Sequence, residues 1–126
     1  MAKLYLIRGL PGSGKSTMAR ALAEEIGAVH YEADQYFMVD GDYRFDPSKL
    51  GAAHAECQAK AETALAMGKS VVVSNTFTTH KEMDPYLGFA EYHGVRAEIR
   101  TATGSFGSVH DVPAETLERM RARWED

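Results

Sequence analysis

The chain has 126 residues, of which 44% are hydrophobic and 25% are charged, and its formal net charge at pH 7 is −4. This length and composition predict one globular domain over residues 1–126, and the acidic balance argues against a wide nucleic-acid footprint, which needs a basic face. The chain has no apolar run near the roughly 20 residues of a membrane span, and its start does not resemble a secretion signal. We therefore expect a cytoplasmic protein with no membrane partner, in which the lone Cys57 is a packing residue.

The first third of the chain predicts a strand, a glycine-rich turn and a helix. Residues 3–8 form a short, mostly apolar run that is typical of a buried strand. Residues 17–26 place Met18, Ala21, Leu22 and Ile26 on one face of a helix that ends at a glycine. Between them, residues 9–17 read GLPGSGKST and fit the pattern G-x-x-x-x-G-K-[ST] at every fixed position.

This pattern is the phosphate-binding loop, or Walker A motif, and it predicts a site for ATP or GTP with Mg²⁺. Main-chain N–H groups of such a loop point at the phosphates, Lys15 reaches the β- and γ-phosphates, and the Ser16 hydroxyl holds Mg²⁺. The predicted nucleotide ligands in this loop are Gly9, Pro11, Gly12, Ser13, Gly14, Lys15, Ser16 and Thr17. A glycine-rich turn with no ligand is the alternative, but a strand before the motif and a helix after it are the context that phosphate binding requires.

The rest of the chain alternates apolar runs with helical patterns. We expect strands at residues 28–32, 69–74 and 95–102, helices at residues 46–67, 80–93 and 113–124, and a hairpin at residues 36–45 with an Asp-Gly turn. This order predicts an α/β fold of three layers, with a mostly parallel sheet and helices on both faces. The site should lie beyond the carboxyl ends of the strands, where the loop 9–17, Asp34 and the polar loops 75–79 and 103–111 would meet.

The combination of motifs resembles P-loop kinases related to phage 5′-hydroxyl polynucleotide kinase. It resembles still more closely a group of small stand-alone AAA-type ATP-binding proteins and predicted kinases, with a vertebrate branch named for binding a ubiquitin ligase. The similarity spans about residues 4–125, and its motifs lie at residues 8–17, 32–34, 36–41, 45–50, 73–78, 109–110 and 112–113. It implies the P-loop NTPase fold and transfer of a γ-phosphate to a hydroxyl, such as a nucleic-acid 5′ end or a nucleoside.

The resemblance also implies roles for particular residues. Asp34 falls on the position of the general base, which accepts the proton of the attacking hydroxyl, and Lys15 is the second predicted catalytic residue. Ser16 and Asp34 are the predicted metal ligands. The alternative for Asp34 is a helix N-cap, a common position for aspartate.

Two departures from the phage enzyme concern arginines. Phe37 stands where that enzyme has an arginine that grips nucleic-acid phosphate, and the lid segment 104–111 contains no arginine. An arginine that offsets charge on the transferring group can contribute about 10³–10⁵ in rate. His110 in the lid and Arg119 on the last helix are the predicted substitutes, with a solvated helix face as the alternative for Arg119.

Two further features have more than one interpretation. Asn75 stands where many P-loop proteins have a metal-organising aspartate, so it either contacts the nucleotide site or ties its loop to the phosphate-binding turn. The aromatic residues of the segment 36–45 either stack on a base or cover the core, and we favour the core.

Three functions are therefore compatible with the sequence. The first is an ATP- or GTP-dependent phosphotransferase that acts on a nucleic-acid end or a nucleoside. The second is a nucleotide-binding module or weak ATPase that works through a protein partner, which would supply the missing arginine. The third is a kinase for a small molecule.

Overall fold

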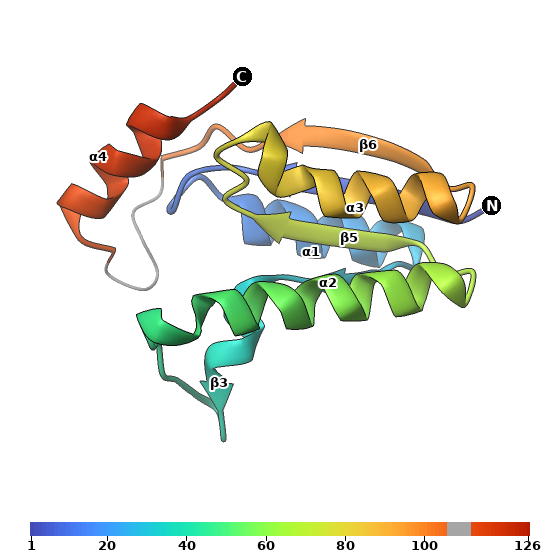
Figure 1. Ribbon diagram of the computed structural model, residues 1–126, viewed down its shortest axis with the longest axis horizontal. Coiled ribbons are helices and arrows are strands. Elements are labelled where there is room, and N and C mark those ends of the chain that lie inside the picture. Colours follow the sequence, from blue (N-terminus) through green and yellow to red (C-terminus); the bar gives the residue numbers. More distant parts are fainter. Residues whose placement is uncertain (106–111) are drawn as a thin grey trace.

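The computed structural model describes residues 1–105 and 112–126. Its centre is a four-stranded sheet in the order β2-β5-β1-β6, formed by β1 (Lys3–Arg8), β2 (Val29–Tyr31), β5 (Val71–Asn75) and β6 (Arg96–Thr101). Every pairing in this sheet is parallel, so the carboxyl ends of all four strands lie at one edge (Figure 1).

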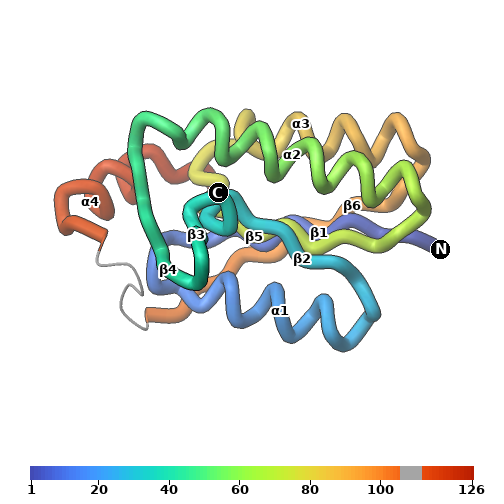
Figure 2. The backbone as a smooth tube through the Cα atoms, turned by 90° about the horizontal axis from the view of Figure 1, so that it is seen from below, coloured from blue at the N-terminus to red at the C-terminus, as the bar shows by residue number. Residues whose placement is uncertain are grey.

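Helices cover both faces of the sheet. The helix α1 (Lys15–Ile26) lies on one face, while α2 (Leu50–Ala66) and α3 (His80–Tyr92) lie side by side on the other (Figure 2). The last helix, α4 (Ala114–Arg123), lies near the carboxyl ends of the strands (Figure 1). The predicted α/β architecture of three layers, with a parallel sheet and helices on both faces, is confirmed.

The core follows from the alternation of side chains along the two central strands. Leu4 and Leu6 belong to the cluster under α2 and α3, whereas Tyr5 and Ile7 belong to the cluster under α1. Strand β5 is buried on both faces, because valines 71 and 73 enter the first cluster and valine 72 enters the second. Uninterrupted β-branched residues at 71–73 suit a central parallel strand, which has no solvent-facing side.

The segment between β2 and α2 differs in part from the prediction. The hairpin exists, with β3 (Met38–Val39) antiparallel to β4 (Asp42–Tyr43) and a turn in which Asp40 (φ 51°) and Gly41 (φ 85°) are left-handed. The residues before it form a 3-10 helix, η1 (Ala33–Phe37), rather than strand. This tight turn places the Phe37 ring in a core cluster with alanines 33 and 53. Burial of the ring stabilises the fold more than two further ladder hydrogen bonds on an isolated hairpin would.

A second short 3-10 helix, η2 (Pro47–Lys49), precedes α2 and begins where the Asp46 side chain accepts a hydrogen bond from the Ser48 amide. The buried face of α1 also differs from the prediction. Ala19, Leu22 and Ala23 are buried, whereas Ala21 and Ile26 are exposed. Small alanines at the contact let the helix approach the sheet closely, so the buried face follows the alanines instead of the largest side chains.

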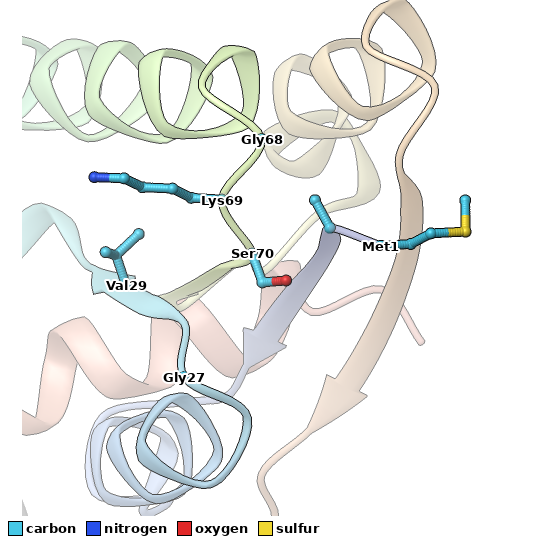
Figure 3. A pocket seen from close by; sticks show the side chains of 7 residues that line it. Met1, Gly27, Val29, Gly68, Lys69 and Ser70 are labelled. Carbon is cyan, nitrogen blue, oxygen red and sulfur yellow. The ribbon is translucent and has the colours of Figure 1, made fainter.

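The opposite edge of the sheet, at the amino ends of the strands, has a shallow hollow. It is lined by Met1, Ala2, Gly27, Val29, Gly68, Lys69 and Ser70, and Figure 3 shows that helix ends and strand beginnings surround it. Parallel α/β sheets bind ligands at the carboxyl ends instead, so this hollow is not the expected site. Among the helices described, none has the length and apolar character that crossing a lipid bilayer demands.

Candidate functional site

The loop that joins β1 to α1 has the backbone geometry of an anion-binding turn. Gly12 (φ 83°) and Gly14 (φ 87°) are left-handed, and Gly14 is the residue that precedes α1. The turn is closed by a hydrogen bond of 3.0 Å from the Ser13 amide to the Leu10 carbonyl oxygen. Because the first amides of a helix have no acceptor within that helix, those of α1 are available to an anionic ligand at this turn.

Gly9 shows how tightly the loop is folded. A Cβ atom at this position would lie 2.3 Å from the Ser13 hydroxyl and 3.0 Å from the Ala102 carbonyl oxygen. The Ser13 hydroxyl is buried and has no hydrogen-bond partner among the described residues. Only glycine fits at position 9 without displacing the loop, and the loop is therefore pre-shaped before any ligand arrives.

The predicted site segments do meet at the carboxyl edge of the sheet. The Gly9 amide donates to the Thr76 carbonyl oxygen at 3.3 Å, and the Gly104 amide donates to the Ser13 carbonyl oxygen at 3.0 Å. The segment that carries Asp34 is tied to the end of β5 by a hydrogen bond of 2.8 Å from the Ala33 amide to Asn75 Oδ1. Hydrogen bonds thus connect the phosphate-binding loop, directly or through β5, to the loop 75–79, to the segment of Asp34 and to the described residues of the loop 103–111.

Lys15 lies partly buried at the start of α1, close to two carboxylates. Burial lowers the pKa of its ammonium group, and the charges of Asp34 and Glu32 act in the opposite direction. A partly desolvated ammonium flanked by carboxylates interacts strongly with a phosphate, since little water screens it. This environment agrees with the predicted contact of Lys15 with a triphosphate.

Ser16, the next residue, donates a hydrogen bond of 2.7 Å to the carboxylate of Glu32. The same Glu32 oxygen accepts a hydrogen bond of 2.8 Å from the Ser74 hydroxyl, and His30 Nε2 lies 2.7 Å from that hydroxyl. Burial lowers the pKa of His30, against the opposing charge of Glu32. A continuous polar chain therefore runs from His30 through Ser74 and Glu32 to the proposed magnesium ligand.

Asp34 is the second residue of η1, and its side chain is exposed. The N-cap position of η1 is occupied by Glu32, so the capping alternative for Asp34 is not realised. One Asp34 oxygen accepts a hydrogen bond of 3.4 Å from the Tyr43 hydroxyl, and burial together with Asp34 raises the pKa of Tyr43 to about 12. The Asp34 carboxylate therefore contacts the Tyr43 hydroxyl, and its charge acts on Lys15.

Asn75 is buried, and both ends of its amide face protein. Its oxygen accepts from Ala33, and its nitrogen lies 3.8 Å from the Cys57 sulfur. Cys57 is itself buried, which raises the pKa of its thiol and fits a packing residue. The geometry favours a structural role for Asn75 in holding the segment of Asp34, and its contact with nucleotide stays a prediction.

Arg8 is a site residue that the sequence reasoning missed. It is buried and donates hydrogen bonds to the carbonyl oxygens of Phe77 (2.7 Å), Thr78 (3.4 Å) and Glu125 (2.5 Å). Its guanidinium carbon lies 4.0 Å from the ring centre of Trp124. Arg8 thereby fixes the loop after β5, in which the buried Phe77 has a left-handed backbone (φ 46°) that costs a non-glycine residue energy.

The two predicted substitutes for lid arginines have different outcomes. Arg119 is exposed and donates a hydrogen bond of 3.1 Å to the Thr116 hydroxyl on its own helix, so its contact with nucleotide stays a prediction. His110 lies outside the described residues.

The P-loop fold implies Mg²⁺, and the residues present fit it. Within residues 1–105 and 112–126, no three His, Cys, Asp or Glu side chains group closely enough to hold a metal ion by themselves. Mg²⁺ needs no such cage, because it keeps several waters and takes phosphate oxygens as ligands. The carboxylate beside Ser16 is that of Glu32, whereas Asp34 is the carboxylate that the sequence predicted as a metal ligand.

Glu32 stands in the sequence only two residues before Asp34. The signal that could have indicated it is the pairing of an acidic residue at the end of β2 with a hydroxyl at the end of β5, since neighbouring parallel strands end at the same edge.

Comparison with known proteins gives a consistent family signal. The AAA domain family matches residues 4–105 of this chain. A human relative, NEDD4-binding protein 2, is 39% identical over an alignment of 128 residues, which covers 93% of this chain and 7% of that protein. This chain thus spans only a small part of the length of this curated relative.

Solved structures agree on the fold. A chain of the Pnkp1/Rnl/Hen1 complex has a TM-score of 0.66 at 22% identity, over 94% of this chain and 38% of that one. A gluconokinase from Sinorhizobium meliloti 1021 has a TM-score of 0.65 at 19% identity, over 98% of this chain and 75% of that one. At these identities the likeness shows the fold, which is that of P-loop kinases.

Proposed function

This chain belongs to the AAA domain family, and on that premise we propose that it is a phosphotransferase that moves the γ-phosphoryl group of ATP or GTP to an acceptor hydroxyl. The observation that carries the proposal is the meeting of a pre-shaped phosphate-binding loop with two carboxylates. Lys15 belongs to that loop, and the charges of Asp34 and Glu32 raise its pKa against the effect of burial. The likeness of the fold to that of a gluconokinase supports a kinase function.

We assign the phosphate contacts first. The α1 amides and Lys15 bind and orient the β- and γ-phosphates, and Ser16 with Glu32 holds the hydrated Mg²⁺. When bound, Mg²⁺ neutralises charge on the phosphate oxygens. Glu32 accepts hydrogen bonds from Ser16 and Ser74 in the structure, and its carboxylate would help to hold a hydrated metal ion beside Ser16.

Asp34 is the general base of the proposed reaction. Its exposed carboxylate orients the acceptor hydroxyl and takes its proton as the oxygen attacks the γ-phosphorus. The new bond joins acceptor oxygen to phosphorus, the bond from phosphorus to the β-phosphate oxygen breaks, and the nucleoside diphosphate leaves. Lys15 offsets the charge that develops on the leaving oxygen.

A second candidate is a nucleotide-binding module or weak ATPase that acts through a protein partner. The arrangement of arginines favours it. Arg8 bonds carbonyl oxygens and lies over the Trp124 ring. Arg119 donates a hydrogen bond to the Thr116 hydroxyl, and Arg123 Nε lies 3.3 Å from the Thr78 hydroxyl. Charge on the transferring group would then be offset by an arginine of a partner, as in GTPases with their activators.

A turnover assay separates the two functions. We expect Mg-ATP turnover to rise when a hydroxyl acceptor is added, and Asp34→Asn to lower phosphoryl transfer about 10²–10⁴-fold while ATP affinity is retained. Lys15→Ala should weaken ATP binding roughly 10–100-fold, because it removes a charged hydrogen-bond donor. Asp84→Asn, which changes an exposed carboxylate on α3, is the matched control. Turnover that is equal with and without every acceptor would contradict the kinase and favour the ATPase module.

A further inference from the structure

The segment beside Asp34 carries two aromatic rings, of Tyr43 and Phe45, that the core covers only in part. Tyr43 and Phe45 are parallel, with 6.3 Å between ring centres and 7° between ring planes. Both meet the buried Phe37 ring nearly edge-on, at 6.3 Å and 5.1 Å between centres. Phe37 therefore serves as a rigid base that holds the two outer rings in fixed positions.

The outer part of this cluster is open to solvent. Phe45 is 50% exposed, although a phenylalanine of this size would gain from burial. Met38, also 50% exposed, is the cross-strand partner of Tyr43 and so lies on the same face of the hairpin. We call Met38, Tyr43 and Phe45 the aromatic face.

The aromatic face is continuous with the proposed reaction centre. The Tyr43 hydroxyl donates to Asp34 at 3.4 Å, and the charge of Asp34 acts on Lys15. Asp34 therefore interacts both with the lysine of the phosphate-binding loop and with the aromatic face. An acceptor whose hydroxyl lies at Asp34 would extend the rest of its body over Tyr43 and Phe45.

We propose that the aromatic face binds a planar ring of the phosphoryl acceptor by stacking, so that the acceptor is a nucleoside or the terminal nucleoside of a short single strand. This inference rests on the proposed function. In a nucleoside, one sugar separates the hydroxyl from the base, which matches a carboxylate adjacent to a ring. Every base has a π face, so stacking of this kind tolerates different bases.

The charge of the region limits the size of the acceptor. Asp40 and Asp42 are exposed at the hairpin tip, and the whole chain is acidic. A long strand would place phosphates near these carboxylates, whereas a single nucleoside or a strand end would not. A short acceptor is therefore favoured over a continuous nucleic-acid track.

The test compares two sides of the same hairpin. Val39, 42% exposed, pairs with Asp42 and lies on the face opposite Met38 and Tyr43, so Val39→Ala is the matched control. The probe is a 5′-hydroxyl oligonucleotide with 2-aminopurine as its first base, whose fluorescence falls on stacking. Binding is measured with Mg²⁺ and a non-hydrolysable ATP analogue, and KM is measured with ATP.

We expect Phe45→Ala to weaken binding and raise KM about 10-fold, within the range found for loss of one stacking contact. Phe45→Trp should retain the oligonucleotide affinity and the KM of the wild type, and Val39→Ala should leave the two quantities unchanged. ATP affinity should be the same in all four proteins, which controls for loss of fold.

Three results would overturn the stacking proposal. One is equal binding by wild type, Phe45→Ala and Val39→Ala. Another is efficient phosphorylation of ribose, which has no planar ring, with no binding of the oligonucleotide. The third is the observation that the aromatic face binds a protein but does not bind the oligonucleotide. In these cases the kinase function would stand, whereas absence of ATP binding by the wild type would contradict the kinase function itself.

Discussion

A single carboxylate oxygen, on Glu32, joins the two halves of the proposed metal site. It accepts hydrogen bonds from Ser16, in the phosphate-binding loop, and from Ser74, the last residue but one of strand β5. The hydroxyls hold the carboxylate in one orientation before metal arrives. Outer ligands of this kind set metal affinity even where they do not touch the ion.

Glu32→Gln tests this role. We expect Mg²⁺-dependent nucleotide affinity to fall about 10–100-fold, because the amide offers a neutral oxygen to metal-bound water. Binding of ATP without a divalent ion should change little. Calorimetric titration with Mn²⁺ in place of Mg²⁺ measures the metal directly. Glu24→Gln, at an exposed position on α1, is the control, and equal Mn²⁺ affinity in the three proteins would contradict the assignment.

The pKa of His30 gives a pH dependence of stability with a defined sign. Burial lowers this pKa from 6.5 in spite of Glu32, so the unfolded chain binds a proton at higher pH than the folded chain does. Stability is then complete above the unfolded value and decreases as the pH falls through 6.5 toward the lowered value. We expect the urea midpoint of the wild type to decrease over this range more than that of His30→Gln. Parallel pH profiles of the two proteins would mean that His30 binds its proton at the same pH in the folded and unfolded chains, which would contradict the lowered pKa.

At the scale of elements, Arg8 links three segments that are far apart in sequence. It ends β1, bonds the loop that follows β5, and contacts Trp124 just beyond α4. The Glu125 amide donates to the Thr78 carbonyl oxygen at 2.7 Å, and the Glu125 side chain accepts from the first amide of α3 at 2.7 Å. These contacts hold the end of α4 against the carboxyl edge of the sheet.

Arg8→Lys should destabilise the protein by about 2–4 kcal/mol, since an ammonium cannot reproduce the planar set of donors with which the guanidinium bonds the carbonyl oxygens of Phe77, Thr78 and Glu125. Trp124→Ala should cost less, about 1–2 kcal/mol, because it removes the ring contact and one exposed hydrogen bond to Asp126 but leaves the bonds from Arg8 to the loop in place. Urea unfolding gives both values. Similar losses in the two variants would mean that packing on Trp124, and not the hydrogen bonds to the loop, is the larger contribution of Arg8.

The order and type of the elements followed from local signals. The run 3–8, the left-handed Gly27 and the Asp-Gly turn act within a few residues, and each is found where it was predicted. Local signals were weaker at the segment 33–37, where burial of Phe37 against α2 overrides its β propensity. The aromatic segment proved to be divided, since Phe37 is in the core and Phe45 is half exposed.

The polar contacts of the site were harder to predict, because their partners lie far apart along the chain. Asn75 bonds the amide of Ala33, and Arg8 bonds the carbonyl of Phe77. The backbone turn of the loop 9–17 was easier to predict, since its motif lies within nine consecutive residues, and its phosphate contacts stay a prediction. Glu32 and Arg8 required the strand order, which places the ends of β1, β2 and β5 side by side.

For the molecule as a whole, the site lies where all four parallel strands end, so a ligand there contacts several elements at once. The loop after β1, the start of η1, the end of β5 and the segment after β6 are already joined by hydrogen bonds. A triphosphate bound among them binds the folded chain and not the unfolded one. Its binding energy therefore adds to the stability of the entire fold.

Thermal unfolding with and without Mg-ATP measures this coupling. At a free ligand concentration about 100 times Kd, we expect stabilisation of about 2.7 kcal/mol and a rise in Tm of roughly 10 °C for a chain of this size. Asp34→Asn should keep the shift, because its proposed role concerns the acceptor, whereas Lys15→Ala should lose most of it at the same ligand concentration. A wild-type Tm that is indifferent to millimolar Mg-ATP and Mg-GTP would contradict nucleotide binding by the loop, and with it the proposed reaction, since every assigned residue acts on a phosphate held there.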